Sequence, residues 1–486
     1  MSNNSRRDFI KKSALSGLAF GTGFLGSTNG FSSQKSRTGT AKNIIFMVSD
    51  GMSIGTLTIA DLLKQSKYGE KTHWMSLYEN PDRKFHRGLM DMAALDSTVT
   101  DSSAASSSWG CGHRINNGAV NVGPNGENYR TILEIFRDAG KATGLVTTTR
   151  ITHATPAGFA TNAESRGMED EIAEQYSDRN FDLLMGGGHR HFSSDSREDG
   201  QDLYQKMRNH GYEVARNKTE MNSADKSKKF LGIYFDSHLP FTVDHQTIEE
   251  LSENVPTLAE MTTEALTRLE QNNQGFILQV EGGRVDHAAH GNDAAGLGFD
   301  QIAFDDAVKV VMDYTKNRED TLVILTTDHG NANPGLSAHG SGYRQSPIMM
   351  DTLLKYRHSF EWMYRELDFQ WSEESPENNV SEQQIRDVIE YATNTQITKE
   401  QAKKIHTAFR GEFRSPYGQR RGTGAVMSGV LANYNGIYFI STSHTADYVE
   451  LAAWGPGSDQ IPPLVKNTSL FDLMVETAGV LEYTTG

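Results

Sequence analysis

A serine that follows an aspartate, at the head of a run of small residues, is the stretch best suited to chemistry. Residues 99–110 read VTDSSAASSSWG. We expect Asp101 to end a loop and Ser102 to begin a helix, whose first turn offers free N–H groups and partial positive charge to an anion. Ser102 is then a possible nucleophile toward a phosphate. Aspartate and serine are also ordinary helix caps, so this stretch alone leaves both interpretations open.

Acidic residues and histidines recur just after apolar runs. Such runs are typical of buried parallel strands, and ligands bind at the carboxyl ends of the strands in an open α/β sheet. The residues that we select at or near these ends are Asp50, Ser102, His153, Thr155, Arg166, Glu281, Asp286, His287, His290, Asp328, His329 and His444. A single histidine is usually structural, but a set of this size predicts a shared site.

The spacing within this set predicts metal ligands. Asp286 and His290 stand four residues apart, which places them on one face of a helix. Asp328 and His329 are adjacent and offer two ligands from one turn. Mixed aspartate and histidine ligands suit zinc, whereas an oxygen-only set of Asp, Glu and Thr suits magnesium with waters.

The elements that must position these residues alternate between strands and helices. This pattern predicts an α/β fold, with a doubly wound, mostly parallel central sheet and helices on both faces. The expected strands are residues 43–48, 143–148, 181–185, 230–235, 275–280, 321–327 and 437–440, and expected helices include residues 129–138 and 256–272.

Composition excludes some classes of protein. The chain has 486 residues and a net charge of -15, which argues against general nucleic-acid binding because that function needs a basic face. An anionic substrate would therefore need a locally positive site. Cys111 is the single cysteine, so no internal disulfide is expected, and we interpret it as a small buried residue on the helix after Ser102.

The N-terminus predicts export. Residues 5–12 read SRRDFIKK and precede a mild apolar run, a pattern that resembles a twin-arginine signal. That run is too short for a membrane span, and no later stretch looks transmembrane. We expect residues 1–30 to be the export signal, 31–41 a linker and 42–486 the catalytic domain, in a protein that is periplasmic or otherwise exported.

Residues of about 346–433 look like an accessory insertion. Two capping boxes, Ser381 with Gln384 and Thr398 with Gln401, predict helices there. The segment also carries Arg410, Arg414, Arg420 and Arg421. We expect a largely helical, solvated surface, because no acid or histidine motif follows a strand within it.

The motifs resemble those of the alkaline phosphatase family, over about residues 42–340 and 437–486. The resemblance implies that Ser102, in Thr-Asp-Ser, is the phosphorylated nucleophile and that Arg166 binds the phosphate. It implies one zinc ion at Asp50, Asp328 and His329, a second zinc ion at Asp286, His290 and His444, and a magnesium ion at Asp50, Thr155 and Glu281.

The same resemblance implies the reaction. The chain is expected to hydrolyse small-molecule phosphate monoesters through phosphoserine, with two zinc ions and one magnesium ion, and to form a homodimer. Two metals about 4 Å apart can hold the attacking and leaving oxygens of an in-line displacement. His153 and His287 stand where some bacterial members carry Asp and Lys, so we expect them to touch or tune the third metal site.

Two other functions remain to be weighed. A phosphodiesterase or sulfatase of the same superfamily would share much of the site, but the sulfatase pattern of Cys or Ser followed by x-Pro-x-Arg is absent after Ser102. Arg166 favours monoesters, because a diester carries one negative charge fewer. An exported protein that only binds metal or phosphate would not need the nucleophile.

Overall fold

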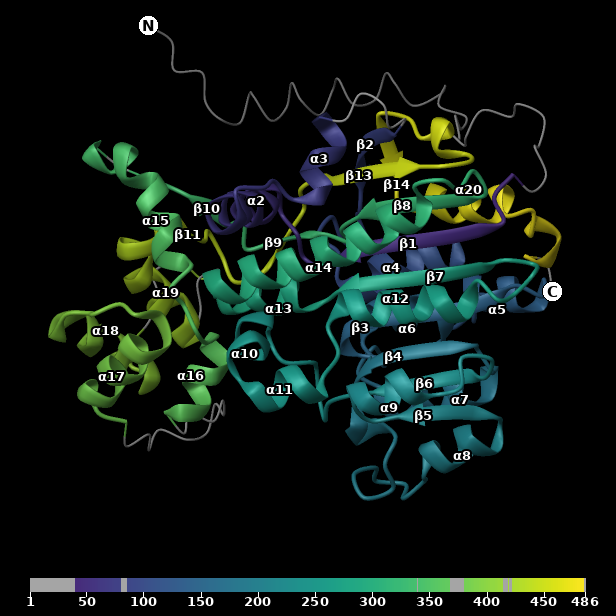
Figure 1. Ribbon diagram of the computed structural model, residues 1–486, viewed down its shortest axis with the longest axis horizontal. Coiled ribbons are helices and arrows are strands. Elements are labelled where there is room, and N and C mark those ends of the chain that lie inside the picture. Colours follow the sequence, from purple (N-terminus) through teal and green to yellow (C-terminus); the bar gives the residue numbers. More distant parts are fainter. Residues whose placement is uncertain are drawn as a thin grey trace, which may run out of the picture. The chain divides into compact units, whose positions relative to one another are not determined.

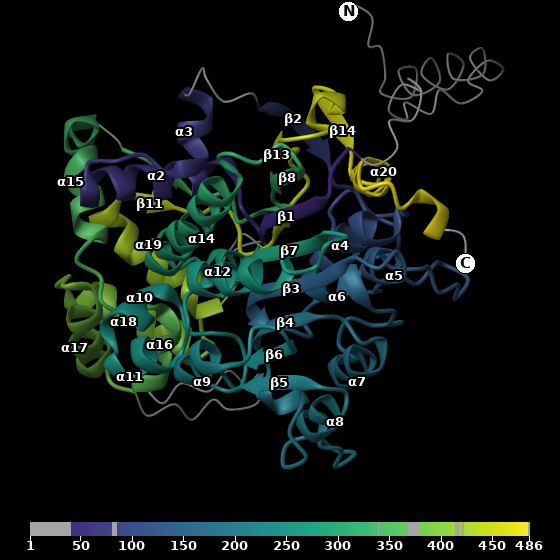
Figure 2. The ribbon, with the colours of Figure 1, turned by 45° about the vertical axis from the view of Figure 1, so that its right-hand side comes forward.

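The computed structural model describes residues 40–79, 85–338, 340–367, 380–413, 418 and 422–484 (Figures 1 and 2). The predicted export signal, most of the predicted linker, and Arg414, Arg420 and Arg421 lie outside the described residues. None of the helices within the described ranges is long and apolar enough to cross a membrane.

A ten-stranded sheet forms the centre, in the order β14-β2-β13-β8-β1-β7-β3-β4-β6-β5. Every strand pair in it is parallel except the two that β13 makes with β2 and β8. The strands are β1 (Asn43–Ser49), β2 (His86–Asp91), β3 (Ala142–Arg150), β4 (Leu183–Gly187), β5 (Tyr212–Ala215), β6 (Lys229–Ile233), β7 (Phe276–Gly282), β8 (Thr321–Thr326), β13 (Val449–Trp454) and β14 (Leu464–Lys466). The predicted fold class is confirmed.

Helices cover both faces of the sheet, with α4 (Ser102–Cys111), α5 (Ile132–Asp138) and α6 (Ala154–Ala160) on one face and α12 (Leu258–Leu269) and α14 (Ala294–Thr315) on the other (Figures 1 and 2). The side chains of β1 alternate accordingly. Phe46 packs its ring 4.8 Å from Trp109 of α4 and 5.2 Å from Phe159 of α6, whereas Ile45 and Met47 join the large core cluster that includes Leu297 of α14.

Helices form at both expected places, 129–138 and 256–272, with shifts at their ends, and at further places for which no range was predicted. They are α2 (Ile54–Tyr68), α3 (His73–Glu79), α4 (Ser102–Cys111), α5 (Ile132–Asp138), α6 (Ala154–Ala160), α7 (Glu169–Arg179), α8 (Leu203–Asn209), α9 (Lys218–Ser223), α10 (Thr242–Thr247), α11 (Glu249–Asn254), α12 (Leu258–Leu269), α13 (Arg284–Gly291), α14 (Ala294–Thr315), α15 (Ser346–Leu353), α16 (Phe360–Glu366), α17 (Glu382–Thr393), α18 (Lys399–Phe409), α19 (Gly422–Asn435) and α20 (Ser469–Thr477). The helix expected from residue 129 begins at Ile132, because Thr131 and Glu134 form a capping box.

Strand register brings the predicted acids to one edge. Val48 of β1 lies opposite Glu281 of β7 and Thr326 of β8. Because the three strands are parallel and end together, Asp50, Glu281 and Asp328 reach the same end of the sheet.

The expected sheet strand at residues 437–440 is wrong. Only β11 (Ile437–Tyr438) forms there, and it pairs with β10 (Gly335–Leu336) in a separate two-stranded ribbon. Ile437 and Phe439 are buried, whereas Tyr438 and Ile440 are 45% and 65% exposed, so only one face of this short apolar run is covered. The place in the sheet is taken by β13, whose apolar pattern is interrupted by Glu450, a buried carboxylate that accepts a hydrogen bond from Tyr78.

The segment 346–433 contains five of the described helices, α15 to α19, and both predicted capping boxes are present. The segment also has a buried side. Leu353, Met363 and Ile389 are fully buried and belong to the same hydrophobic cluster as the central sheet. Within the described residues, these helices are therefore packed onto the core rather than attached as a loose appendage.

Candidate active site

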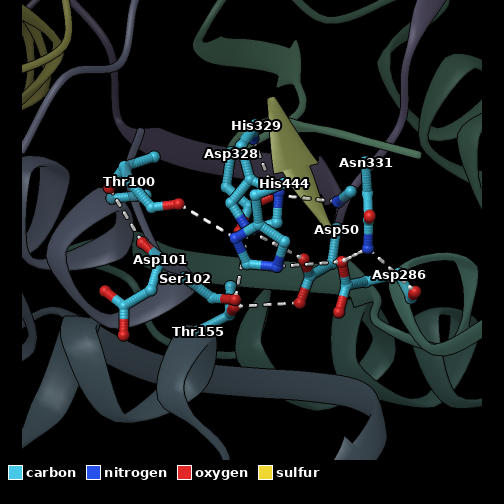
Figure 3. A network of polar contacts seen from close by, with 12 residues as sticks. Asp50, Thr100, Asp101, Ser102, Thr155, Asp286, Asp328, His329, Asn331 and His444 are labelled. Carbon is cyan, nitrogen blue, oxygen red and sulfur yellow. Dashed lines mark hydrogen bonds and ion pairs between the residues drawn. The ribbon is translucent and has the colours of Figure 1, made fainter. Parts of the chain in front are cut away.

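Ser102 lies at the start of α4, as predicted (Figure 3). Asp101 is the N-cap and its carboxylate accepts hydrogen bonds from the Ala104 N–H at 2.9 Å and from the Ser103 hydroxyl. Ser102 is 1% exposed, and its Oγ is 3.3 Å from Nε2 of His329. Asp101, and not Ser102, caps the helix. The Ser102 hydroxyl therefore faces the strand ends.

Arg166 reaches the same place from the chain after α6. Its guanidinium donates to Asp101 Oδ2 at 3.0 Å and lies 3.1 Å from Nε2 of His153. The side chain is 29% exposed, so one part is held by protein and another faces solvent. Arg166 was selected from the sequence, but its contact with Asp101, the residue before Ser102, was not predicted.

His290 and His444 turn the same ring nitrogen toward each other and toward Asp286. Their Nε2 atoms are 2.9 Å apart, and Asp286 carboxylate oxygens lie 3.4 and 3.5 Å from them. Nδ1 of His290 donates to the Thr442 carbonyl and Nδ1 of His444 to the Thr100 carbonyl. In the neutral rings both Nε2 atoms therefore present lone pairs to one point, which is the arrangement of metal-ligating histidines.

A second group forms around His329. Its Nε2 lies 3.7 Å from Asp50 Oδ1 and 3.2 Å from Asp328 Oδ2, and Asp50, Asp286 and His329 can also face one ion. Sequence reasoning assigned Asp286 to the other ion alone. The structure places Asp286 between the two groups, with Asn331 donating to its Oδ1 at 2.7 Å.

A third group joins Asp50, His153 and Glu281. The Thr155 hydroxyl is 3.5 Å from Asp50 Oδ2, so the expected oxygen set is brought together. The Thr147 hydroxyl donates to Glu281, a contact that sequence reasoning did not anticipate.

Several buried polar atoms in these groups have no hydrogen-bond partner among the described residues of the protein. They are Asp50 Oδ1, Glu281 Oε1, Asp328 Oδ2, His329 Nδ1 and His153 Nδ1. A buried polar atom without a partner is costly, so in most proteins it has one. The three carboxylate oxygens among them stand at predicted ligand positions and fit bound cations and their waters.

The carboxylates at the strand ends oppose one another's ionisation. Burial, followed by the charges of Asp328 and Asp286, raises the pKa of Asp50 well above its ordinary value. Burial also raises the pKa of Glu281 to about 7 and that of Asp328 to about 6. Divalent cations would remove this repulsion, because they favour the ionised form of each ligand.

Asp286 is the exception among these acids. Burial alone would raise its pKa, but the charges and hydrogen bonds of His290 and His444 lower it well below the ordinary value. In the same way the Asp286 carboxylate overcomes burial and raises the pKa of His290 to about 9. A proton and a cation thus compete for the same ring nitrogens.

His153 and His287 lie together with a third ring, His238, which sequence reasoning missed. The ring centroids of His238 and His287 are 4.3 Å apart. The centroid of His153 lies 5.4 Å from that of His287 and 5.5 Å from that of His238. Burial lowers the pKa of all three, and neighbouring arginines add to the effect for His153 and His287. His238 follows β6 without any motif, so no pattern in the sequence pointed to it.

A fourth group of possible ligands, His73, Asp305 and Asp306, lies elsewhere. Lys64 already occupies it, since its Nζ is 2.7 Å from Asp305 Oδ2 and is itself buried. Asp305 also accepts the backbone N–H groups of His73 and Trp74. This group is a satisfied ion pair at the start of α3.

Comparisons with known proteins agree with the fold and with the family that the motifs resemble. A family model described as alkaline phosphatase matches residues 41–480. Alkaline phosphatase 4 of Bacillus subtilis is 30% identical over 468 residues, covering 94% of this chain and 93% of that protein. The alkaline phosphatase of Escherichia coli is 29% identical, covering 60% and 70%. The crystal structure of Thermus thermophilus alkaline phosphatase superimposes with a TM-score of 0.83 at 32% identity, covering 92% and 93%.

Proposed function

Because the chain belongs to the alkaline phosphatase family, a metal-dependent family whose members hydrolyse phosphate monoesters, we propose that it does so through a phosphoserine at Ser102. The observation that carries this proposal is the buried Ser102 hydroxyl at the start of α4, directed at His329 and the metal-ligand groups. A covalent intermediate divides one difficult displacement into two easier ones.

Two zinc ions and one magnesium ion are the proposed cofactors. Asp50, Asp328 and His329 would hold one zinc ion, and Asp286, His290 and His444 the other. Asp50, Thr155 and Glu281 would hold magnesium, with His153 and His287 beside it. The unpartnered buried atoms and the facing Nε2 lone pairs support this assignment. When bound, the zinc ions supply positive charge that favours an ionised serine and a departing alkoxide.

The chain's own groups then act in order. The Ser102 hydroxyl loses its proton to solvent and Oγ attacks phosphorus, the bond from phosphorus to the alcohol oxygen breaks, and the alcohol leaves with a proton from solvent. Water next attacks the phosphoserine and gives up a proton, the bond from phosphorus to Ser102 Oγ breaks, Oγ takes up a proton again, and inorganic phosphate leaves. The free N–H groups of α4 and the Arg166 guanidinium stabilise the negative phosphoryl oxygens in both steps.

Arg166 is proposed to select monoesters. Asp101 and His153 hold its guanidinium beside Ser102, so it can donate two parallel hydrogen bonds to non-bridging oxygens. Arg166→Ala should reduce monoester turnover more than diester turnover. Equal losses for a chromogenic monoester and its matching diester would contradict this role, and higher wild-type activity on the diester would favour the phosphodiesterase alternative.

The nucleophile is tested by Ser102→Ala, with Ser108→Ala as the matched control on the same helix. Ser108 is buried but donates to the Ala105 carbonyl and lies away from the ligand groups. We expect Ser102→Ala to lose the acid-stable phosphoenzyme and roughly 10³-fold or more of kcat, and Ser108→Ala to keep both. Full activity without Ser102 would end this mechanism.

The domain limits, export and assembly complete the proposal. Residues 1–30 would be a twin-arginine signal for the periplasm or beyond, 31–41 a linker and 42–486 the catalytic domain, with 346–433 an insertion relative to compact family members. Replacing Arg6 and Arg7 by lysine should retain the enzyme in the cytoplasm, and unimpaired export would contradict the signal. A homodimer is proposed from the family, and light scattering of the purified chain measures it.

A further inference from the structure

The short helix α13, which carries Asp286 and His290, is contacted at both ends by the segment 346–433. We propose that Glu361 of α16 and Gly424 of α19 are positioning residues that hold α13 so that its two ligands face His444. The inference rests on the proposed function, because that function gives Asp286 and His290 their metal-binding role.

α13 depends on its neighbours for its position. It has eight residues, and its N-cap is Gly283, which has no side chain that could cap the helix. Isolated helices shorter than about 12–15 residues are marginal in water, so packing must fix this one. A small rotation of α13 would separate both ligands from His444 at once, because they share one helical face.

The first contact is at the start of α13. The Arg284 side chain is 5% exposed and pairs with Glu361, which is 48% exposed. The Arg284 guanidinium also donates to Nδ1 of His287 at 2.9 Å, and it lies 3.7 Å from the centroid of the Phe241 ring. Exposed ion pairs contribute little, but a buried guanidinium is costly when it loses its paired carboxylate. The charge of Arg284 also favours the ionised form of Asp300, but Asp300 is already bonded to Thr242, and Glu361 is the carboxylate that pairs with the guanidinium directly.

The second contact is at the end of α13. A Cβ atom at Gly424 would lie 2.5 Å from the Gly291 carbonyl oxygen, so the backbones of α19 and α13 touch. Just beyond, the Asp293 carboxylate accepts the Phe360 N–H of α16 at 2.7 Å while it caps α14. The turn after α13 is therefore tied to the same two helices.

The consequence is a role for a segment that carries no ligand. Glu361 of α16 neutralises the charge of Arg284, the first residue of α13. Gly424 of α19 sets how closely the backbone of α19 approaches Gly291, the last residue of α13. The helices of the segment 346–433 thus fix one wall of the metal site from behind, which links the packing of that segment to metal retention.

The experiment uses the full chain loaded with zinc and magnesium, and two variants with matched controls. Glu361→Gln removes the charge at nearly constant shape, and Glu400→Gln is its control in an exposed α18 pair with Lys404. Gly424→Ala closes the backbone contact, and Gly335→Ala is its control because no atom lies within 4 Å of the added Cβ. Two readouts are needed: zinc release to a colorimetric chelator, and hydrogen exchange of the α13 amides in metal-free protein.

We expect Glu361→Gln and Gly424→Ala to release one of the two zinc ions about 10-fold faster, and to exchange the α13 amides about 10-fold faster, with both controls within about twofold of wild type. Unchanged zinc release from a folded Glu361→Gln protein overturns the proposal, and so does faster exchange spread over the whole core. If the wild-type chain binds no zinc and hydrolyses no monoester, the proposed function fails, whereas the exchange measurement still decides whether α13 is held.

Discussion

The molecule contains two groups of buried carboxylates that differ in how their oxygens are satisfied. One group stands at the strand ends, and the other lies where α10 and α14 meet the start of α16. The first group is Asp50, Glu281 and Asp328, and the second is Asp244, Asp293 and Asp300. Each member of the first group has a buried oxygen without a protein partner, whereas no oxygen of the second group does.

In the second group, backbone and hydroxyl donors replace water. Asp244 accepts the Ser359 N–H and hydroxyl, Asp293 accepts three backbone N–H groups, and Asp300 accepts the N–H and hydroxyl of Thr242. Both groups are therefore buried. They differ in that the carboxylates of the first group keep oxygen lone pairs that no protein donor has taken. A cation fits the first group, and the second joins helices.

The largest expected effect is a difference in metal retention and activity between one substitution in the first group and one in the second. Asp328→Asn should lower kcat/KM by roughly 10³-fold and release metal, because an amide is a weaker ligand than a carboxylate. Asp244→Asn should keep its metal and lose about 1–3 kcal/mol of unfolding free energy, since hydrogen bonds to its carboxylate are weakened. Metal analysis and urea unfolding measure both, and equal metal loss from the two variants would erase the distinction.

An intermediate effect concerns the pH dependence of stability in the second group. Burial raises the pKa of Asp300 from 3.8 to about 7. An aspartate whose folded pKa is raised favours folding below its unfolded pKa, and this contribution declines as the pH rises toward 7. Asp300→Asn should therefore gain about 2–4 kcal/mol relative to wild type between pH 4 and pH 8.

Urea unfolding in the presence of a chelator measures that gain without a contribution from metal. Asp313→Asn is the control, because it changes an exposed acid on the same helix and should shift stability by less than about 0.5 kcal/mol. A pH-independent difference for Asp300→Asn would contradict the raised pKa of Asp300, because the folded and unfolded proteins would then bind the same number of protons.

The smallest expected effect adds a carboxylate to the strand-end group. His153→Asp should tighten magnesium by about tenfold, because it replaces an imidazole beside Asp50 and Glu281 by a hard oxygen ligand. The wild-type enzyme should then show a larger rise in activity on adding magnesium than the variant. His153→Asn loses the same ring without adding charge and is the control. An unchanged magnesium titration would mean that His153 does not tune this site.

Local sequence patterns were sufficient for part of the site. The Thr-Asp-Ser motif predicted the start of α4, and the i, i+4 spacing of Asp286 and His290 predicted one face of α13. The expected sharing of Asp50 between two ligand groups is also seen in the geometry. These features depend on residues close in the chain or on strands that end at one edge, and both leave a periodic signal.

Contacts between distant segments left no such signal. His238, Asn331 and the pair of Arg284 with Glu361 follow no motif, and β13 was obscured because Glu450 breaks its apolar run. The apolar run before Ser441 suggested a sheet strand where the chain forms a short ribbon. Each case depends on what packs opposite, and spacing along the chain does not encode it.

The sequence by itself therefore determined the fold class and the residues proposed as nucleophile and metal ligands, because helical and strand periodicities place side chains on defined faces. Only the tertiary structure decided which carboxylate oxygens keep free lone pairs, which ring nitrogens face each other, and which helices fix α13. The physical reason is that a lone pair is left free or is bonded by donors from segments far apart in sequence. Those donors meet it only when the core packs.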